Sequence, residues 1–286
     1  MVHDPFYDLF PRPDLPPFVA RGTALVTIDM QYLDAHPDGW MGRIARTEGK
    51  PELLAERFAA IDEIVPRIAM LQEAFREAEQ EVLHVRVKYR TDDGRDAPKA
   101  YMPAPEAQPV DRDEKDDEFL VGIGPVGDEM VFSKTSASVF SSTAIETVLR
   151  RMGIEHLVMT GLVTDGCVEL SARDACDRGF AVTLVTDATC ASTRAAHEDA
   201  LNRMTDGGFI AARTTHEVVR EIAAVAAESQ SASARSLSRV GGLCGGKRKE
   251  PAYACTNYRR RRLLRQGTRA SFRAQRPRGR RHRSRP

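Results

Sequence analysis

The sequence predicts an α/β fold in which a mainly parallel β-sheet carries helices on both faces. Short apolar runs alternate along the chain with longer segments whose apolar residues recur every three or four positions. That alternation is typical of strands connected by amphipathic helices. The run at residues 157–160 is apolar almost without interruption, as expected of a parallel strand buried on both faces. Helices must then cover both sides of the sheet.

Six segments are predicted to be strands, because they are short, rich in apolar or β-branched residues, and bounded by charged or turn-forming residues. They are residues 23–28, 82–87, 130–133, 157–160, 180–186 and 209–212.

Five segments between and after these strands have helical periodicity. They are residues 52–80, 145–152, 168–178, 195–204 and 216–227. Pro66 is expected to bend the first helix, and Ser142 or Thr143 to cap the second. Gly153 and Gly179 follow the second and third helices, where a glycine favours the left-handed conformation that ends a helix.

The connection at residues 88–128 is the least regular part of this region. It contains several prolines and the run DRDEKDDE at residues 111–118. Connections of this length inside a compact domain are usually functional or disordered. We expect a partly ordered lid over the strand ends, with the charge run on the solvated surface.

The 286-residue chain has an acidic part, residues 1–228, and a basic part, residues 229–286. The formal net charge is +1, yet residues 229–286 contain 18 Lys/Arg and a single acidic residue, Glu250. The first 228 residues hold the other 24 Lys/Arg and 40 of the 41 Asp/Glu. We therefore expect a Pro-rich arm at residues 1–22, an α/β domain at residues 23–228, and a disordered, basic, low-complexity tail at residues 229–286.

The expected compartment is the cytoplasm. Five scattered cysteines form no CxxC pair, and the chain begins without a signal-peptide pattern, which favours a reducing environment. No uncharged apolar run is long enough to span a membrane. The seven histidines show no ligand spacing, so we expect no catalytic metal.

Three candidate catalytic residues each follow the carboxyl end of a predicted strand: Asp29, Lys134 and Cys167. In a parallel sheet these ends meet at one edge, where such folds bind their ligands. A buried lysine requires a carboxylate partner, and a cysteine at the start of a helix is expected to favour the thiolate. An acid, a base and a thiol are the parts of an activated nucleophile. The alternative is that Cys167 is a small buried apolar residue.

The chain resembles the isochorismatase-like cysteine hydrolases across residues 23–227. The matching motifs are Asp29-Met30-Gln31, Ser133-Lys134 ahead of Phe140, and G-x-x-T-x-x-C-V at residues 161–168. This resemblance implies a three-layer α/β/α sandwich around a six-stranded parallel sheet. It also implies a triad of Asp29, Lys134 and Cys167, a cis peptide bond between Val163 and Thr164, and a homo-oligomer, either a dimer or a tetramer.

Within that family, members with the cysteine cleave amides. The motif at residues 167–169 with Arg173-Asp174 looks most like the biuret, ureidoacrylate and N-carbamoyl amide hydrolases. Nicotinamidases carry an Asp-x-His metal motif after the second strand, where this chain has residues 87–90, Val-Lys-Tyr-Arg. Asp34 stands where an aromatic residue is common, five positions after the aspartate, and this departure bears on substrate preference.

The implied reaction is hydrolysis of a small amide through a thioester, with release of ammonia and no cofactor. Asp29 would act as the base, Lys134 would hold its carboxylate, and Cys167 would attack the carbonyl carbon. Backbone N–H groups of Thr164 and Cys167 would form the oxyanion hole. The candidate substrate contacts are Gln31, Tyr32 and Phe140.

Two other classes of function are weighed against this one. A catalytically silent scaffold of the same fold would have no use for all three triad residues. The arginine-rich tail would suit phosphate contacts in a nucleic-acid-binding protein, but its Arg/Pro/Gly/Ser bias favours a disordered appendage. We therefore do not expect a nucleic acid or a membrane as partner.

Overall fold

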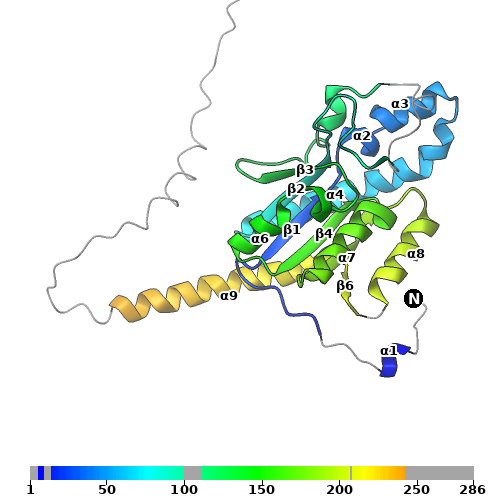
Figure 1. Cartoon of the computed structure of the whole chain (residues 1–286). Coiled ribbons are helices and arrows are strands. Elements are labelled where there is room, and N and C mark those ends of the chain that lie inside the picture. The colour runs from blue at the N-terminus through cyan, green and yellow to red at the C-terminus, as the bar shows by residue number, and fades with distance from the viewer. Residues whose placement is uncertain (1–5, 10–13, 100–110, 207, 242–286) are drawn as a thin grey trace, which may run out of the picture. The chain divides into compact units, whose positions relative to one another are not determined.

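The computed structural model describes residues 6–9, 14–99, 111–206 and 208–241 (Figure 1). The chain forms two units, Met1–Ser236 and Leu237–Pro286. The described part of the second unit is the end of helix α9 (Thr215–Gly241). The sheet and the other described helices belong to the first unit.

A six-stranded sheet forms the centre of this unit, as predicted, and every neighbouring pair of strands is parallel. The strand order is β3-β2-β1-β4-β5-β6. The strands are β1 (Thr23–Ile28), β2 (Glu81–Val87), β3 (Met130–Lys134), β4 (His156–Leu162), β5 (Ala181–Cys190) and β6 (Ile210–Arg213). The fifth strand is the one that differs most from its prediction, since it extends to Cys190.

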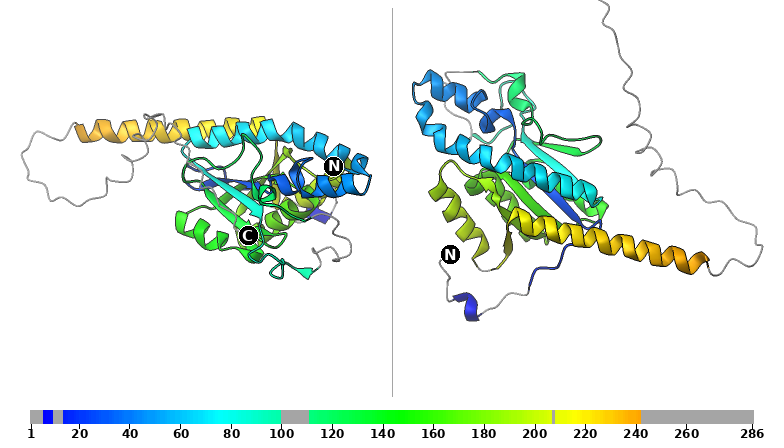
Figure 2. Two further views of the ribbon diagram at one scale, coloured as in Figure 1. Left: turned by 90° about the horizontal axis from the view of Figure 1, so that it is seen from above. Right: turned by 180° about the vertical axis from the view of Figure 1, so that it is seen from behind.

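Both faces of the sheet are covered. Every residue of β1 and β4 is buried, and side chains alternate between two apolar clusters, with Val26 in one and Leu25 in the other. Helix α4 (Ala55–Glu77) and the part of α9 that carries Val218 and Ile222 cover one face. The other face is covered by α5 (Val139–Ser142), α6 (Ile145–Met152), α7 (Glu169–Asp177) and α8 (Arg194–Thr205). Figure 2 shows the two helical layers on opposite sides of the strands. The predicted three-layer sandwich is confirmed.

The start of α6 differs from its prediction. The residue that caps α6 is Ala144, so the prediction of Ser142 or Thr143 was wrong. Ser142 instead ends the additional short helix α5, which Ser138 caps. Thr143 still accepts a hydrogen bond from the Ile145 N–H at 3.2 Å. Two hydroxyl residues thus each bind a free backbone donor at the start of a separate short helix, Ser138 at α5 and Thr143 at α6.

Helix α9 continues beyond the predicted domain boundary. It ends at Gly241, so the first part of the region expected to be disordered is helical. The prediction for the remaining tail falls on residues 242–286, which lie outside the described residues. At the other end of the domain, Phe18 of the Pro-rich arm is buried, and its ring meets that of His156 edge-on at 4.7 Å between centroids.

The irregular connection is anchored to the sheet edge by its second half. Leu120 and Ile123 are buried in the core, and Phe119 forms an antiparallel bridge with Gln31. We expected the charge run at residues 111–118 to lie on the solvated surface, and this prediction is wrong for Asp116. Asp116 is fully buried and accepts two hydrogen bonds from Arg43, at 3.1 and 2.8 Å. The guanidinium balances the buried charge. Residues 100–110 of the predicted lid lie outside the described residues.

Three further helices are short: α1 (Phe6–Leu9), α2 (Tyr32–Ala35) and α3 (Trp40–Thr47). Single 3₁₀ turns occupy Pro51–Leu54 and Glu114–Asp117. Across the described ranges, every helix is too short or too polar to cross a membrane.

Candidate active site

The candidate site lies where the strand order changes direction. Strand β1 stands between β2 and β4, so the chain builds the sheet outward on both sides of it. Side chains that follow β1 and β4 therefore share a crevice at the carboxyl edge. Asp29 follows β1 directly, Cys167 comes five residues after β4, and Lys134 ends β3.

The structure brings these three side chains together through the ammonium group of Lys134. Its Nζ lies 2.7 Å from Asp29 Oδ2 and 3.2 Å from Cys167 Sγ. It also donates to the Ser136 carbonyl oxygen at 3.0 Å. Lys134 is completely buried, and these contacts use all three of its N–H donors. Every donor of the ammonium therefore has an acceptor.

Backbone geometry at the ends of β1 and β4 sets the distance between acid and thiol. Asp29 adopts a left-handed conformation, with φ of 55°, in which few non-glycine residues are found. Gly161 of β4 pairs with Ile28 and has φ of 105°. A Cβ atom at position 161 would lie 2.0 Å from the Ile28 carbonyl oxygen. The absence of a side chain there lets β4 approach β1 closely just ahead of the cysteine.

Cys167 lies in a π-helical turn, Thr164–Val168, that precedes α7. The N–H groups of Gly166 and Val168 both donate to the Val163 carbonyl oxygen, at 3.0 and 3.2 Å. The cis peptide bond joins Leu162 and Val163, so the predicted position between Val163 and Thr164 was wrong by one residue. No local signal in the sequence marks its position, because none of these residues is proline.

Burial and charge act on the triad in opposite directions. Burial raises the pKa of Asp29, and the neighbouring Lys134 charge opposes that rise without cancelling it. Burial alone would lower the pKa of Lys134, but the charges of Asp29 and Cys167 and the hydrogen bonds to both side chains together outweigh it, so the lysine pKa is raised and the amine remains protonated.

The thiol of Cys167 is protonated at neutral pH. Burial and the charge of Asp29 raise its pKa to about 12, and Lys134 opposes them only in part. The expectation that the helix start would favour the thiolate was therefore wrong, because desolvation and the nearby carboxylate dominate. A thiol in this state needs a base to remove its proton. The buried Asp29 carboxylate interacts with this thiol through a side-chain hydrogen bond, so it is placed to take the proton.

A residue that the sequence did not reveal supports the turn around the thiol. His197 of α8 places its Nδ1 2.8 Å from Thr164 Oγ1, and Thr164 is completely buried. The two residues are 33 positions apart and form no motif, so nothing local in the sequence indicates this contact.

The predicted substrate contacts have different outcomes. Gln31 is fully buried, and its amide nitrogen donates to the carbonyl oxygens of Val87 and Asp116 at 3.1 and 2.8 Å. Its amide oxygen accepts from the Val87 N–H at 2.6 Å. Gln31 thus connects strand ends and does not offer a free group to a substrate. The prediction overlooked that a buried amide is satisfied first by nearby backbone.

The other two candidates are aromatic. Phe140 packs in the core, with its ring centroid 6.0 Å from that of Phe180 at the amino end of β5, which does not support substrate contact. Tyr32 is half-buried, stacks on His36 at 4.4 Å between centroids, and has Lys115 Nζ 4.6 Å from its ring centroid.

The pair Glu169 and Arg173, part of the motif after the cysteine, belongs to an ion-pair network between two helices. Glu169 lies 3.0 Å from Arg173 within α7 and 2.9 Å from Arg203 of α8. These contacts hold α8 beside the turn that carries the thiol.

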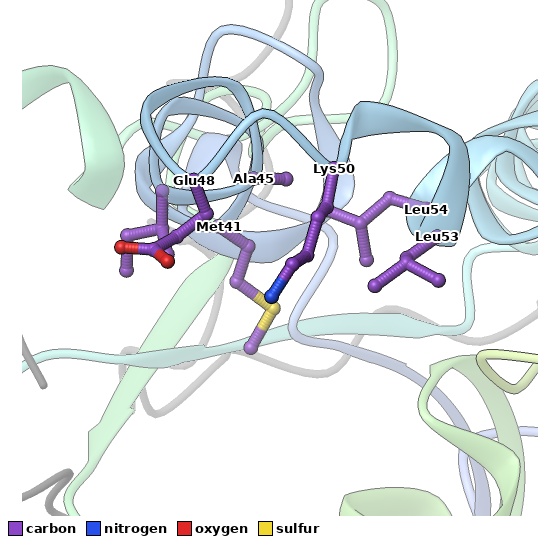
Figure 3. A pocket seen from close by; sticks show the side chains of 7 residues that line it. Met41, Ala45, Glu48, Lys50, Leu53 and Leu54 are labelled. Carbon is purple, nitrogen blue, oxygen red and sulfur yellow. The ribbon is translucent and has the colours of Figure 1, made fainter.

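A separate apolar pocket of about 290 Å³ lies between α3 and the 3₁₀ turn at Pro51–Leu54 (Figure 3). It is lined by Met41, Ile44, Ala45, Glu48, Lys50, Leu53 and Leu54, and none of the triad residues is among them. In the part of the chain that the structure describes, no cluster of three or more His, Cys, Asp or Glu side chains is placed to hold a metal ion.

Comparison with known proteins gives consistent matches. An isochorismatase domain model matches residues 23–217. The isochorismatase family protein YecD of Escherichia coli O157:H7 is 30% identical over 185 residues, which make up 65% of this chain and 88% of YecD. Ureidoacrylate amidohydrolase RutB of Caulobacter vibrioides is 28% identical over 194 residues, covering 62% of this chain and 81% of RutB.

A similar solved structure is that of a cysteine hydrolase from Pseudomonas syringae pv. phaseolicola. It matches with a TM-score of 0.61 and 25% identity, covering 75% of this chain and 99% of the hydrolase.

Proposed function

The chain belongs to the isochorismatase domain family, and from that premise we propose that it is a cysteine-dependent amidohydrolase acting on small ureido, carbamoyl or related amides. The observation that carries this proposal is the position of Lys134 Nζ, within reach of both the Asp29 carboxylate and the Cys167 sulfur. Similarity to a ureidoacrylate amidohydrolase and to a cysteine hydrolase supports the same class.

The reaction begins with transfer of the Cys167 proton to Asp29. This transfer moves one negative charge from the carboxylate to the sulfur, and the Lys134 ammonium contacts both atoms. The lysine therefore stabilises the charge before and after the transfer. This geometry lowers the cost of ionising a thiol whose resting pKa is high.

The thiolate then attacks the substrate carbonyl carbon, and the carbonyl oxygen becomes an oxyanion. Backbone N–H groups of Thr164 and Cys167 are proposed to bind it. Asp29 returns the proton to the leaving nitrogen as the C–N bond breaks, which releases ammonia and leaves a thioester. Asp29 next deprotonates a water molecule that attacks the thioester. Asp29 then returns that proton to the sulfur. The products are the free acid, which is a carbamic acid where the substrate is a ureido compound, and the regenerated thiol, and none of these steps uses a cofactor.

We also infer the setting in which this enzyme works. The family resemblance supports a homo-oligomer, and five scattered cysteines without a disulfide framework support a reducing cytoplasm.

Ammonia release tests the proposal. The substrates are biuret, a ureidoacid, an N-carbamoyl amino acid and nicotinamide, and we expect turnover of at least one of the first three. Cys167→Ser should lower that rate by at least about a thousandfold, because it removes the nucleophile from a site that acts as a unit.

Cys176→Ala is the matched control, since Cys176 belongs to α7 and its Sγ lies 3.6 Å from the Phe209 carbonyl oxygen, outside the triad. This variant should keep most of the activity. Equal ammonia release by the wild type and Cys167→Ser would remove Cys167 from the mechanism. A preference for nicotinamide would contradict the assignment to ureido and carbamoyl amides.

A further inference from the structure

A second acid lies close to the triad, and the mechanism does not use it. Asp34 belongs to α2, five residues after Asp29, and its Oδ2 accepts from Arg57 Nη2 at 3.0 Å. Arg57 Nε also donates to the Asp34 carbonyl oxygen at 3.0 Å, and Nη1 donates to Ser192 Oγ at 2.9 Å. Arg57 is only 3% exposed. The guanidinium thus holds Oδ2 of the carboxylate.

The other oxygen of this carboxylate has no partner. Oδ1 of Asp34 is buried and accepts no hydrogen bond from the described residues, although 16% of the side chain is exposed. An unpaired buried acceptor costs free energy that a ligand donor would recover. Burial raises the pKa of Asp34 to about 6, the Arg57 charge opposes this, and Asp29 and Lys134 also act on it. Asp34 lies in α2, which begins three residues after Asp29 at the carboxyl end of β1, so it shares the sheet edge of the triad.

We propose that Asp34 is a specificity residue whose Oδ1 accepts a hydrogen bond from a second N–H group of the substrate, at the end opposite the bond that is cleaved. The proposal rests on the proposed amide hydrolysis and assigns its substrate class: amides with a second terminal NH₂ beyond the scissile carbonyl, as in biuret. Asp34 touches substrate in this assignment, and Arg57 is its positioning residue.

Charge balance favours a neutral ligand over a cationic amine. Arg57 compensates Asp34 and Lys134 compensates Asp29, while the resting thiol is neutral. The crevice therefore has no excess negative charge with which to bind a free ammonium group. Oδ1 needs a donor, and a terminal amide NH₂ supplies one without adding charge.

Two ligands of nearly equal shape test this assignment: biuret, which has a terminal NH₂ at each end, and diacetamide, which has methyl groups there. Binding is measured by calorimetry with Cys167→Ala, so that no turnover occurs. We expect biuret to bind roughly tenfold or more tightly than diacetamide, since a hydrogen bond to a charged acceptor contributes that much. Equal affinities, or no binding of biuret at millimolar concentrations, would overturn the proposal.

Asp34→Asn in the same background is the informative variant. The amide oxygen of the substituted side chain can still accept a hydrogen bond from Arg57. Its NH₂ group then occupies the position of Oδ1, so a hydrogen-bond acceptor is replaced by a donor. The preference for biuret over diacetamide should disappear, with thermal melting showing that the protein remains folded. If Asp34→Asn kept the full preference, Asp34 would not be the contact.

Glu129→Gln is the matched control. Glu129 is also a buried carboxylate held by an arginine, with Arg76 Nε 2.7 Å from its Oε1, but it precedes β3 at the opposite edge of the sheet from Lys134. Its substitution should leave the ligand preference unchanged. An equal loss in both variants would indicate a general effect of removing buried charge and would overturn the assignment to Asp34.

The pH dependence gives a further readout. Arg57 of α4, Asp29 after β1 and Lys134 of β3 are the charged groups that act on Asp34. As the pH falls through about 6, protonation of Asp34 should weaken binding of biuret, while Asp34→Asn should show no such change. Hydrolysis that survives Cys167→Ser would overturn the proposed mechanism, whereas loss of the Asp34 effect alone would overturn only this assignment.

Discussion

At the scale of single residues, Lys134 explains how a buried thiol can serve as a nucleophile without being a thiolate at rest. Its ammonium contacts both the proton donor and the acceptor. The sequence was sufficient to place Asp29, Lys134 and Cys167 at one edge, because each follows a predicted strand. It was not sufficient to give the sign of the Cys167 pKa shift, since that depends on burial and on the distance to Asp29, which only the tertiary structure sets.

Asp29→Asn separates the effect of the Asp29 charge on the thiol pKa from the role of Asp29 as the base. The Asp29 charge raises the pKa of Cys167 and the Lys134 charge lowers it, so removing the carboxylate charge should lower the pKa of the thiol. Hydrolysis should nevertheless fall at least about a hundredfold, because the base has been lost. The variant would then contain more thiolate and less activity than the wild type.

The measurement is the rate of Cys167 alkylation by iodoacetamide across the pH range, followed by peptide mass spectrometry. In the wild type the rate should still be rising above pH 10, because the pKa is about 12. A wild-type thiol that titrates below the ordinary cysteine value of about 8.5 would contradict this account. So would an Asp29→Asn variant whose thiol pKa rises.

At the scale of elements, the sequence predicted the strands and the positions of the long helices because their patterns are local, although α9 extends to Gly241. Hydrophobic periodicity is visible within a dozen residues. The π-helical turn at Thr164–Val168 and the contact of Thr164 with His197 were not predictable, since the partners come from elements that are distant in the sequence. The hydrogen bonds of Gln31 were not predictable for the same reason, because its partners are backbone groups of other segments.

Gly161→Ala tests how the elements create the site. A Cβ there would lie 2.0 Å from the Ile28 carbonyl oxygen, on backbone with φ of 105°. Strands β1 and β4 would have to separate just before Asp29 and Cys167. We expect loss of about 3 kcal/mol or more in the free energy of unfolding, together with loss of amide hydrolysis.

Gly127→Ala is the control for this variant. Gly127 also has positive φ, 68°, but a Cβ there would meet nothing within 4 Å. It should cost only about 1 kcal/mol, the strain of the left-handed conformation, and leave hydrolysis intact. Urea denaturation of both variants decides between the two causes: similar losses would mean that backbone conformation, and not close strand approach, explains the need for glycine at position 161.

At the scale of the whole molecule, the packed domain should end before the chain does. The side chains of α9 known to pack on the core are Val218, Val219, Ile222, Val225 and Ala226, and all of them precede Gln230. Truncation after Gln230 should therefore change the free energy of unfolding by no more than about 0.5 kcal/mol, and should leave ammonia release unchanged. Truncation after Glu217 removes the buried Val218 and Ile222 and should cost several kcal/mol. Urea denaturation of the full chain and both truncated forms provides the comparison. A loss above about 2 kcal/mol on truncation after Gln230 would show that residues beyond it pack on the domain. If the full chain bound nucleic acid and the form truncated after Gln230 did not, and if that binding weakened steeply with salt, the basic tail would have a role of its own.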